Sequence, residues 1–246
     1  QKGDEINLLA VTFNEMLDRI ESLIKEMKEM SDNIAHDLKS PITRIRGAAE
    51  IALSTGAPRE EFETMTASTI EECDRLLEMI NTMLMISRTE SGVDRPPSGI
   101  VDLSNLASEA CELFEPAASD KGISLTCTIG GNGAMHGDIK MLRRMIANLI
   151  DNAIKYTPAG GNVNIGLRRI ASNIHLSVTD TGIGISSEDL PHIFERFYRG
   201  DRSRSEAGLG LGLSLAQAIA RAHGGTITVT STQNQGTTFS VILPGK

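Results

Sequence analysis

The sequence lacks a long apolar run, a paired cysteine spacing and any excess of positive charge. No stretch of about 18 apolar residues occurs, so no part of the chain is predicted to span a bilayer. Cys73, Cys111 and Cys127 are scattered and odd in number, which predicts neither a disulfide framework nor a metal site and favours a reducing compartment. No signal peptide is recognised, and because the chain starts at Gln1 near the beginning of a heptad pattern, we expect a fragment of a longer protein.

Acidic residues are concentrated in the first part of the chain. Residues 1–90 carry 10 Lys and Arg against 18 Asp and Glu, whereas residues 91–246 carry 14 of each. This acidity argues against nucleic-acid binding. The single basic cluster, Arg196 to Arg204, lies in a glycine-containing stretch and favours a local anion instead. The overall composition, with 40% hydrophobic and 23% charged residues, indicates a soluble globular protein of one large or two ordinary domains.

Two long helices are predicted at the start of the chain. Apolar residues recur every third or fourth position and predict a helix over residues 4–53, ended by turn-forming residues 54–58. A second apolar stripe, widened by Leu77 and Leu84, predicts a helix over residues 60–90. The resulting hairpin has a broad apolar face, so we expect it to dimerise into a four-helix bundle.

One histidine of the first predicted helix has an unusual setting. His36 lies opposite the apolar stripe and should face solvent, with Asp37 beside it and Ser40 one turn further along. Pro41 removes a helical hydrogen bond and should bend the helix just below the histidine. Taken alone, such a histidine is most often only a surface residue.

The pattern changes after a linker at residues 91–99, which contains proline and glycine. Strands are predicted near residues 100–103, 123–129, 163–169, 174–180, 226–231 and 237–243, with helices at 106–120, up to Tyr156 and at 211–223, and an irregular segment at 182–210. This order predicts an α/β sandwich, in which helices cover one face of a sheet of mostly sequential strands.

Three segments of this second part carry groups suited to a nucleotide. Asn148, Asn152 and Lys155 are spaced four and three apart on one helix edge, where amide oxygens suit Mg²⁺ and an ammonium can reach a phosphate. Asp180 ends an apolar strand and can accept a hydrogen bond from an exocyclic amine, while Gly182 and Gly184 allow close backbone approach.

The third segment, Gly208 to Leu213, alternates glycine with leucine before a helix. Its backbone N–H groups can face phosphates at the helix N-terminus. It lacks the Lys-Ser/Thr ending of a P-loop, and it comes too late in the chain for a dinucleotide fold. Each of the three segments alone has an ordinary explanation as a solvated helix edge, a tight turn or a loop.

Taken in order, the motifs resemble those of one family, the sensor histidine kinases of two-component systems. The similar segments are HDLKSP at residues 36–41 (phosphoacceptor box), residues 148–157 (asparagine box), 180–184 and 208–212 (glycine boxes), 194–199 (phenylalanine box) and 236–239 (closing strand). The resemblance implies four parts: residues 1–30 as the last helix of a HAMP relay, 31–90 as the dimerising phosphoacceptor hairpin, 91–99 as a linker, and 100–246 as an ATP-binding α/β sandwich of the GHKL (Bergerat) type.

The resemblance also implies roles for residues. His36 would take the γ-phosphoryl group of ATP, with Asp37 orienting it or accepting its proton, and would pass that group to an aspartate of a response regulator receiver domain. Asn148 and Asn152 would hold Mg²⁺, and Asp180 would meet the adenine amine. The other implied nucleotide-binding residues are Lys155, Tyr156, Gly182, Gly184, Arg199, Gly208, Leu209, Gly210, Leu211, Gly212 and Thr238.

Ser40 departs from the threonine or asparagine common at this place in related kinases, where that residue helps to position water for dephosphorylating the regulator. Serine keeps a hydroxyl but lacks the methyl group that restrains its rotamer, which weakens the case for phosphatase activity. The family further implies a lid at residues 186–210 and a membrane sensor upstream of Gln1. The chain would then be a soluble fragment from the cytoplasmic side of the bacterial inner membrane.

Two alternatives stay open. An ATPase clamp of the gyrase, Hsp90 and MutL type would share the nucleotide domain, but such proteins carry a water-activating glutamate one turn before the magnesium asparagine. Here Asn148 occupies that position and cannot act as a base. The other alternative is a nucleotide-binding signalling scaffold without kinase activity.

Overall fold

The computed structural model describes residues 13–14, 16–17, 20–21, 38–52, 59–90, 99–200 and 210–246. The chain divides into two compact units, Gln1–Glu78 and Met79–Lys246. Several expectations lie outside the described residues: the helix just before residue 38, the turn at 54–58, most of the linker, and the site residues His36, Asp37, Gly208 and Leu209. None of the described helices is long and apolar enough to cross a membrane.

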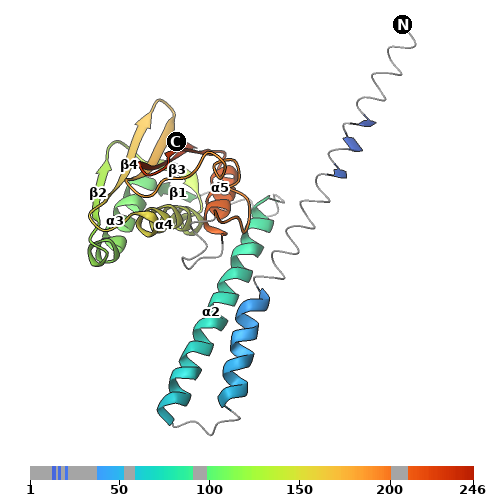
Figure 1. Ribbon diagram of the computed structural model, residues 1–246. Helices are drawn as coiled ribbons and strands as arrows, with labels where there is room; N and C mark the ends of the chain where they lie inside the picture. Colours follow the sequence, from blue (N-terminus) through green and yellow to red (C-terminus); the bar gives the residue numbers. More distant parts are fainter. Residues whose placement is uncertain are drawn as a thin grey trace. The chain divides into compact units, whose positions relative to one another are not determined.

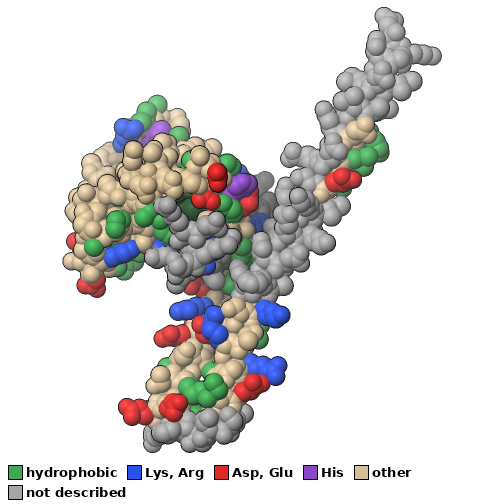
Figure 2. All heavy atoms as spheres, viewed as in Figure 1, with side chains coloured by type: hydrophobic (Ala, Val, Ile, Leu, Met, Phe, Trp, Pro, Cys, Tyr) green, Lys and Arg blue, Asp and Glu red, His purple; other side chains and the backbone are tan. Residues whose placement is uncertain are grey.

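The first unit contains a helical hairpin, as predicted. Residues 38–52 are helical and lie beside α2 (Arg59–Glu90) (Figure 1). Lys, Arg, Asp and Glu side chains are interspersed along the visible face of this hairpin (Figure 2). Apolar side chains are exposed as well: Ile70 and Leu77 of α2 are 55% and 57% exposed in the single chain. This hairpin therefore does not cover its own apolar surface.

The second unit begins within α2, at Met79, and from Gly99 onward it is the predicted α/β sandwich. Its elements are β1 (Gly99–Asp102), α3 (Leu103–Asp120), β2 (Ser124–Ile129), β3 (Ala134–Gly137), α4 (Ile139–Tyr156), β4 (Asn162–Ile170), β5 (Asn173–Asp180), α5 (Gly212–Ala222), β6 (Thr226–Thr232) and β7 (Gly236–Pro244). Five strands form one sheet in the order β2-β4-β5-β7-β6, with β2 parallel to β4 and the other pairs antiparallel. The three helices cover one face of this sheet (Figure 1).

Hydrophobic spacing explains why α4 lies at the centre of the helical layer. Leu142, Met145, Leu149 and Ala153 repeat at helical spacing and are at most 1% exposed. The Asp138 carboxylate accepts hydrogen bonds from backbone N–H groups of the first turn and so defines where α4 begins. Strands β4 and β5 alternate buried with more exposed side chains, as expected when one face of a sheet is covered.

The structure corrects two expectations. The cysteines were expected to form no disulfide, but Cys111 of α3 and Cys127 of β2 are bonded, while Cys73 is free. Packing of α3 on β2 brings the two together, a contact that no local cysteine spacing reveals. The strand β3 was also missed; it pairs with β1 in a separate two-stranded sheet, so the strands are less sequential than expected.

Candidate functional site

The polar edge of α4 faces the beginning of α5. A Cβ at Gly212 would lie 3.4 Å from Asn148 Oδ1 and 3.8 Å from Asn152 Nδ2, so the first turn of α5 approaches both amides closely. The first backbone N–H groups of a helix have no partner within the helix and attract anions. This contact therefore places amide oxygens, which are hard metal ligands, beside an anion-binding helix end.

Asn148 carries a direct sign of an incomplete site. Its Nδ2 atom is buried and has no hydrogen-bond partner among the described residues. A buried polar group without a partner costs free energy, of the order of 1–3 kcal/mol, and native structures rarely keep one without a reason. A hydrogen-bond acceptor held between α4 and α5, such as a phosphate oxygen, would pair with this N–H group, so the site fits a nucleotide; the amide oxygens are the atoms that could hold its metal ion.

Asp180 ends β5 and is only 6% exposed. Its Oδ1 atom accepts hydrogen bonds from the backbone N–H groups of Gly182, at 2.8 Å, and Thr237, at 3.2 Å. Burial raises the pKa of this carboxyl group above its ordinary value, although the two hydrogen bonds oppose the shift. Because both bonds use Oδ1, the other oxygen can accept a hydrogen bond from a ligand amine.

The glycines after Asp180 are required by close backbone packing. A Cβ at Gly182 would lie 2.4 Å from the carbonyl oxygen of Tyr156, which also accepts a hydrogen bond from Ile183 N at 3.1 Å. Gly184 has φ +64°, and a Cβ there would meet the carbonyl oxygen of Thr232 at 2.1 Å. The end of α4 and the β6–β7 turn thus hold this segment in place.

The first part of the predicted lid is folded against the start of α5. Phe197 is buried with φ +64°, and its N–H donates to the carbonyl of Gly210 at 2.9 Å. The Asp189 carboxylate accepts hydrogen bonds from the Tyr198 hydroxyl, at 2.6 Å, and from the Ser186 hydroxyl, at 2.7 Å. These contacts order residues 186–200.

Asp189 and Tyr198 were not singled out from the sequence. The Ser-x-x-Asp spacing of Ser186 and Asp189 is a capping signal that could have indicated the first of them. The partly buried Arg199 directly follows Tyr198 at this place. Phe194 lies edge-on to Phe239, with ring centroids 6.5 Å apart.

The remaining predicted nucleotide-binding residues differ in their contacts and exposure. Lys155 lies with its ammonium 5.1 Å from the centre of the Tyr156 ring. Leu211 is 2% exposed, so it can offer a ligand little beyond its backbone. Thr238 is not brought to Asp180, because its hydroxyl bonds Thr179, and neighbouring strand residues point to opposite faces.

Thr237 is the residue that sequence reasoning missed at this strand. It is the register partner of Asp180 in the β5–β7 pair and is 6% exposed. Its hydroxyl also pairs with that of Ser231 at 2.9 Å. Strand alternation counted from the buried Phe239 would have indicated Thr237 rather than its neighbour.

A buried histidine links the two helices of the site. His223, 6% exposed, follows the last residue of α5, and its Nδ1 lies 2.8 Å from the carbonyl oxygen of Ile219. Its Nε2 accepts a hydrogen bond from Asp138 N, at the start of α4, at 3.0 Å. With Nε2 as the acceptor, Nδ1 is the ring nitrogen that donates to Ile219. The end of α5 is thereby tied to the beginning of α4.

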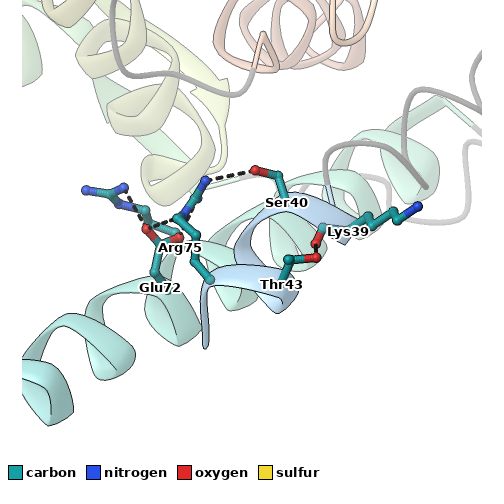
Figure 3. A network of polar contacts seen from close by, with 6 residues as sticks. Lys39, Ser40, Thr43, Glu72 and Arg75 are labelled. Carbon is teal, nitrogen blue, oxygen red and sulfur yellow. Dashed lines mark hydrogen bonds and ion pairs between the residues drawn. The ribbon is translucent and has the colours of Figure 1, made fainter. Parts of the chain in front are cut away.

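Ser40 is the one predicted catalytic residue among the described part of the hairpin. It is exposed, and its hydroxyl oxygen accepts a hydrogen bond from Arg44 Nη1 at 2.8 Å (Figure 3). Arg44 in turn pairs with Glu72 of α2. Arg44 and Glu72 were not singled out from the sequence; the i, i+4 spacing of Ser40 and Arg44 was the available signal.

Together, these features define the second unit as an ATPase-like nucleotide-binding domain. Comparison with protein families supports this class: the model "Histidine kinase-, DNA gyrase B-, and HSP90-like ATPase" matches residues 137–246. The model "His Kinase A (phospho-acceptor) domain" matches residues 26–92, and the HAMP domain model matches residues 1–22. The matches follow the order of the predicted segments.

Individual proteins show the same likeness. The chain is 35% identical over 200 residues to the sensor histidine kinase CusS of Escherichia coli O6:H1, covering 81% of this chain and 42% of CusS. The structure of the mycobacterial sensor histidine kinase MprB is 32% identical, with a TM-score of 0.54, covering 61% of this chain and 98% of that one. ShkA, solved in complex with AMPPNP, is 28% identical with a TM-score of 0.67, covering 86% of this chain and 44% of that one.

The chain belongs to the sensor histidine kinase family of two-component systems. It spans about two fifths of the length of the curated relatives that it matches, 42% in the case of CusS.

Proposed function

We propose that this chain is an ATP-dependent protein histidine kinase that phosphorylates His36 and passes the phosphoryl group to an aspartate of a response regulator receiver domain. The observation that carries the proposal is the α4 edge, where the half-buried amides Asn148 and Asn152 face the N-terminus of α5 and the Asn148 Nδ2 atom is buried. This edge suits a metal–nucleotide complex but offers no base at Asn148 to activate water. An external nucleophile is then needed, and the phosphoacceptor match includes His36.

Within this proposal, each element of the site has a chemical task. Asp180 accepts a hydrogen bond from the adenine amine, and the first turn of α5 provides N–H groups for the phosphates. Asn148 and Asn152 are the residues that would hold Mg²⁺, which when bound neutralises charge on the phosphates. Lys155, Tyr156 and Arg199 are the further candidates for contacts with the phosphates and the base.

The acceptor step follows from the chemistry of imidazole. A neutral ring nitrogen of His36 bonds to the γ-phosphorus while the bond to the leaving oxygen of ADP breaks. The ring proton passes to Asp37 or to solvent. The domain limits 1–30, 31–90, 91–99 and 100–246 remain part of the proposal.

The chain would act as a homodimer through the hairpin. Ile70, Leu77, Ile80 and Leu84 of α2 are each at least 43% exposed in the single chain, more apolar surface than a two-helix unit usually leaves to water. Dimerisation would bury it. Light scattering at micromolar concentration should give a dimer mass; a monomer would contradict this part.

The whole protein would work at a membrane. The HAMP match and the greater length of the relatives support a sensor segment elsewhere in the protein, with this chain on the cytoplasmic side. Replacing the acceptor tests the division of labour between the two units. His36→Gln should abolish incorporation of γ-labelled phosphate and leave ATP affinity unchanged; loss of ATP binding would contradict the separate roles.

A further inference from the structure

The structure shows a contact that restrains the side-chain rotamer of Ser40, which the sequence predicted to be unrestrained. Ser40 has no methyl group to limit its rotamer, and in helices a serine hydroxyl commonly turns back to the carbonyl four residues earlier. Thr43 does so: its Oγ1 bonds the carbonyl of Lys39 at 2.7 Å (Figure 3). Ser40 Oγ accepts a hydrogen bond from Arg44 Nη1 at 2.8 Å.

The direction of the Arg44 guanidinium is set from the other helix. Arg44 Nε lies 3.1 Å from Glu72 Oε1, and Arg44 Nη2 lies 2.8 Å from Glu72 Oε2, so one carboxylate of α2 takes a two-point contact. The Glu72 side chain is 13% exposed, and Arg75 supports it from the same helix at 3.4 Å. With Nε and Nη2 held in this way, the planar group directs Nη1 at Ser40.

An arginine is required for this geometry. Its guanidinium presents donors on both sides of a rigid plane, whereas a lysine ammonium is a point charge on a flexible stem. The hydrogen bond from Arg44 also lowers the pKa of Glu72 below its ordinary value, so this carboxylate is ionised at neutral pH. The contact is therefore in place under the conditions in which a kinase works.

We propose that Arg44, held by Glu72, is a positioning residue that fixes the Ser40 hydroxyl for dephosphorylation of the phosphorylated receiver domain. This inference rests on the proposed function. Among the described residues, Ser40 Oγ pairs with Arg44 through one acceptor site, so its second acceptor site and its hydroxyl proton can serve a water molecule and a phosphoryl oxygen. The hydrogen bond from the cation replaces the restraint that a threonine methyl would provide.

The reaction served by this hydroxyl is hydrolysis of an acyl phosphate. The oxygen of water bonds to phosphorus while the bond between phosphorus and the aspartate carboxylate oxygen breaks. Aspartate and inorganic phosphate are formed, and one proton is released to solvent. Ser40 takes no part in bond making; it orients the water, so its effect depends on how well its rotamer is fixed.

The experiment measures phosphate release from a receiver domain. The probe is the purified receiver that accepts label fastest from the phosphorylated 246-residue chain, phosphorylated separately with a small phosphodonor so that the assay does not depend on the kinase step. Six chains are compared: wild type, Arg44→Ala, Arg44→Lys, Ser40→Ala, Ser40→Thr and the double variant of Arg44→Ala with Ser40→Thr. Arg46→Ala is the matched control, because Arg46 pairs with the exposed Glu50 of its own helix, at 2.7 Å, and with no other residue among those the structure describes.

The positioning role predicts a dependence on the residue at position 40. Arg44→Ala should slow dephosphorylation about tenfold when Ser40 is present, and less than about twofold in the Ser40→Thr background, where the methyl restrains the hydroxyl. Arg44→Lys should resemble Arg44→Ala, and Arg46→Ala should resemble wild type. Circular dichroism verifies that each chain is folded.

Three outcomes would overturn the inference. Equal losses in both backgrounds would show that Arg44 only joins the two helices. An unchanged rate in Arg44→Ala, together with a loss in Ser40→Ala, would show that the serine works without it. If no receiver accepts label from the wild-type chain, the proposed phosphotransfer fails and the inference fails with it, an outcome visible before any variant is measured.

Discussion

Two carboxylates show how differently the two units control a functional group. Glu72 lies on the hairpin beside a guanidinium that is 55% exposed, and the hydrogen bond from Arg44 lowers its pKa. Asp180 is buried at the end of β5, and burial raises its pKa although two backbone N–H groups bond to it. One group is positioned by an opposite charge near solvent, the other by backbone inside a core.

Because Glu72 and Asp180 are held in different ways, they should differ in how easily their contacts break and re-form. Exposed ion pairs contribute only about 0–1 kcal/mol, so the hairpin can break and remake the contacts of Arg44 at little cost. Buried groups are held by packing that tolerates little change. The hairpin suits a surface that must meet changing partners, and the sandwich suits a nucleotide pocket that keeps its shape.

The largest effect is expected from removing the amide that faces α5. Asn152→Ala should weaken magnesium-dependent ATP binding by about 100-fold or more, because the amide that we propose as a Mg²⁺ ligand on the α4 edge is lost. Isothermal titration calorimetry measures it. Asn173→Ala, which removes an exposed amide from the start of β5, is the matched control. Equal ATP affinities for the wild type and Asn152→Ala would show that this edge of α4 does not contribute to ATP binding.

Loss of the buried link between α4 and α5 should reduce stability. His223→Ala leaves the N–H of Asp138 and the carbonyl of Ile219 without this partner, and we expect the free energy of unfolding to fall by about 2 kcal/mol. Urea unfolding followed by circular dichroism checks this. A wild-type midpoint in the variant would show that the histidine is dispensable.

Replacing the buried carboxylate of Asp180 should weaken ATP binding without lowering stability at pH 7. Asp180→Asn should weaken ATP binding about tenfold, because an amide can replace the acceptor oxygen with a donor. A carboxyl group whose pKa is raised on folding contributes stability at low pH and loses that contribution as pH rises through the folded-state pKa. The neutral amide avoids this loss, so stability at pH 7 should not fall. A clear fall in stability at pH 7 would contradict the assigned cause of the shift.

The ion pair of Arg44 and Glu72 should have the smallest effect on stability. Its dependence on pH should be opposite to that of Asp180. The pKa of Glu72 is lowered from its ordinary value of 4.5, so its contribution to stability is complete above that value and is lost as pH falls through the folded-state pKa. Thermal melts of wild type and Glu72→Gln should therefore differ slightly near pH 6 and converge as the pH falls through the lowered pKa of Glu72. A difference that shows no dependence on pH in this acidic range would point to packing instead.

Periodicity in the sequence predicted most of the elements and the polar edge of α4, because local patterns reflect burial directly. It missed what depends on distant contacts. Cys111 and Cys127 meet only because α3 packs on β2, and β3 is too short to show alternation. Thr237 was not singled out, because the register of its strand with β5 was unknown; Thr238 stays a prediction. Arg44 was missed because its partner Glu72 lies on the other helix.

The most direct test of the central claim is the chemistry of the labelled protein. After incubation with Mg²⁺ and γ-labelled ATP, the chain is treated with acid and with alkali, and the labelled peptide is identified. A phosphohistidine bond is lost in acid and survives alkali, whereas a phosphoserine bond behaves in the opposite way. The account predicts acid-labile label on a peptide containing His36. Acid-stable label, or steady phosphate release without label, would contradict it.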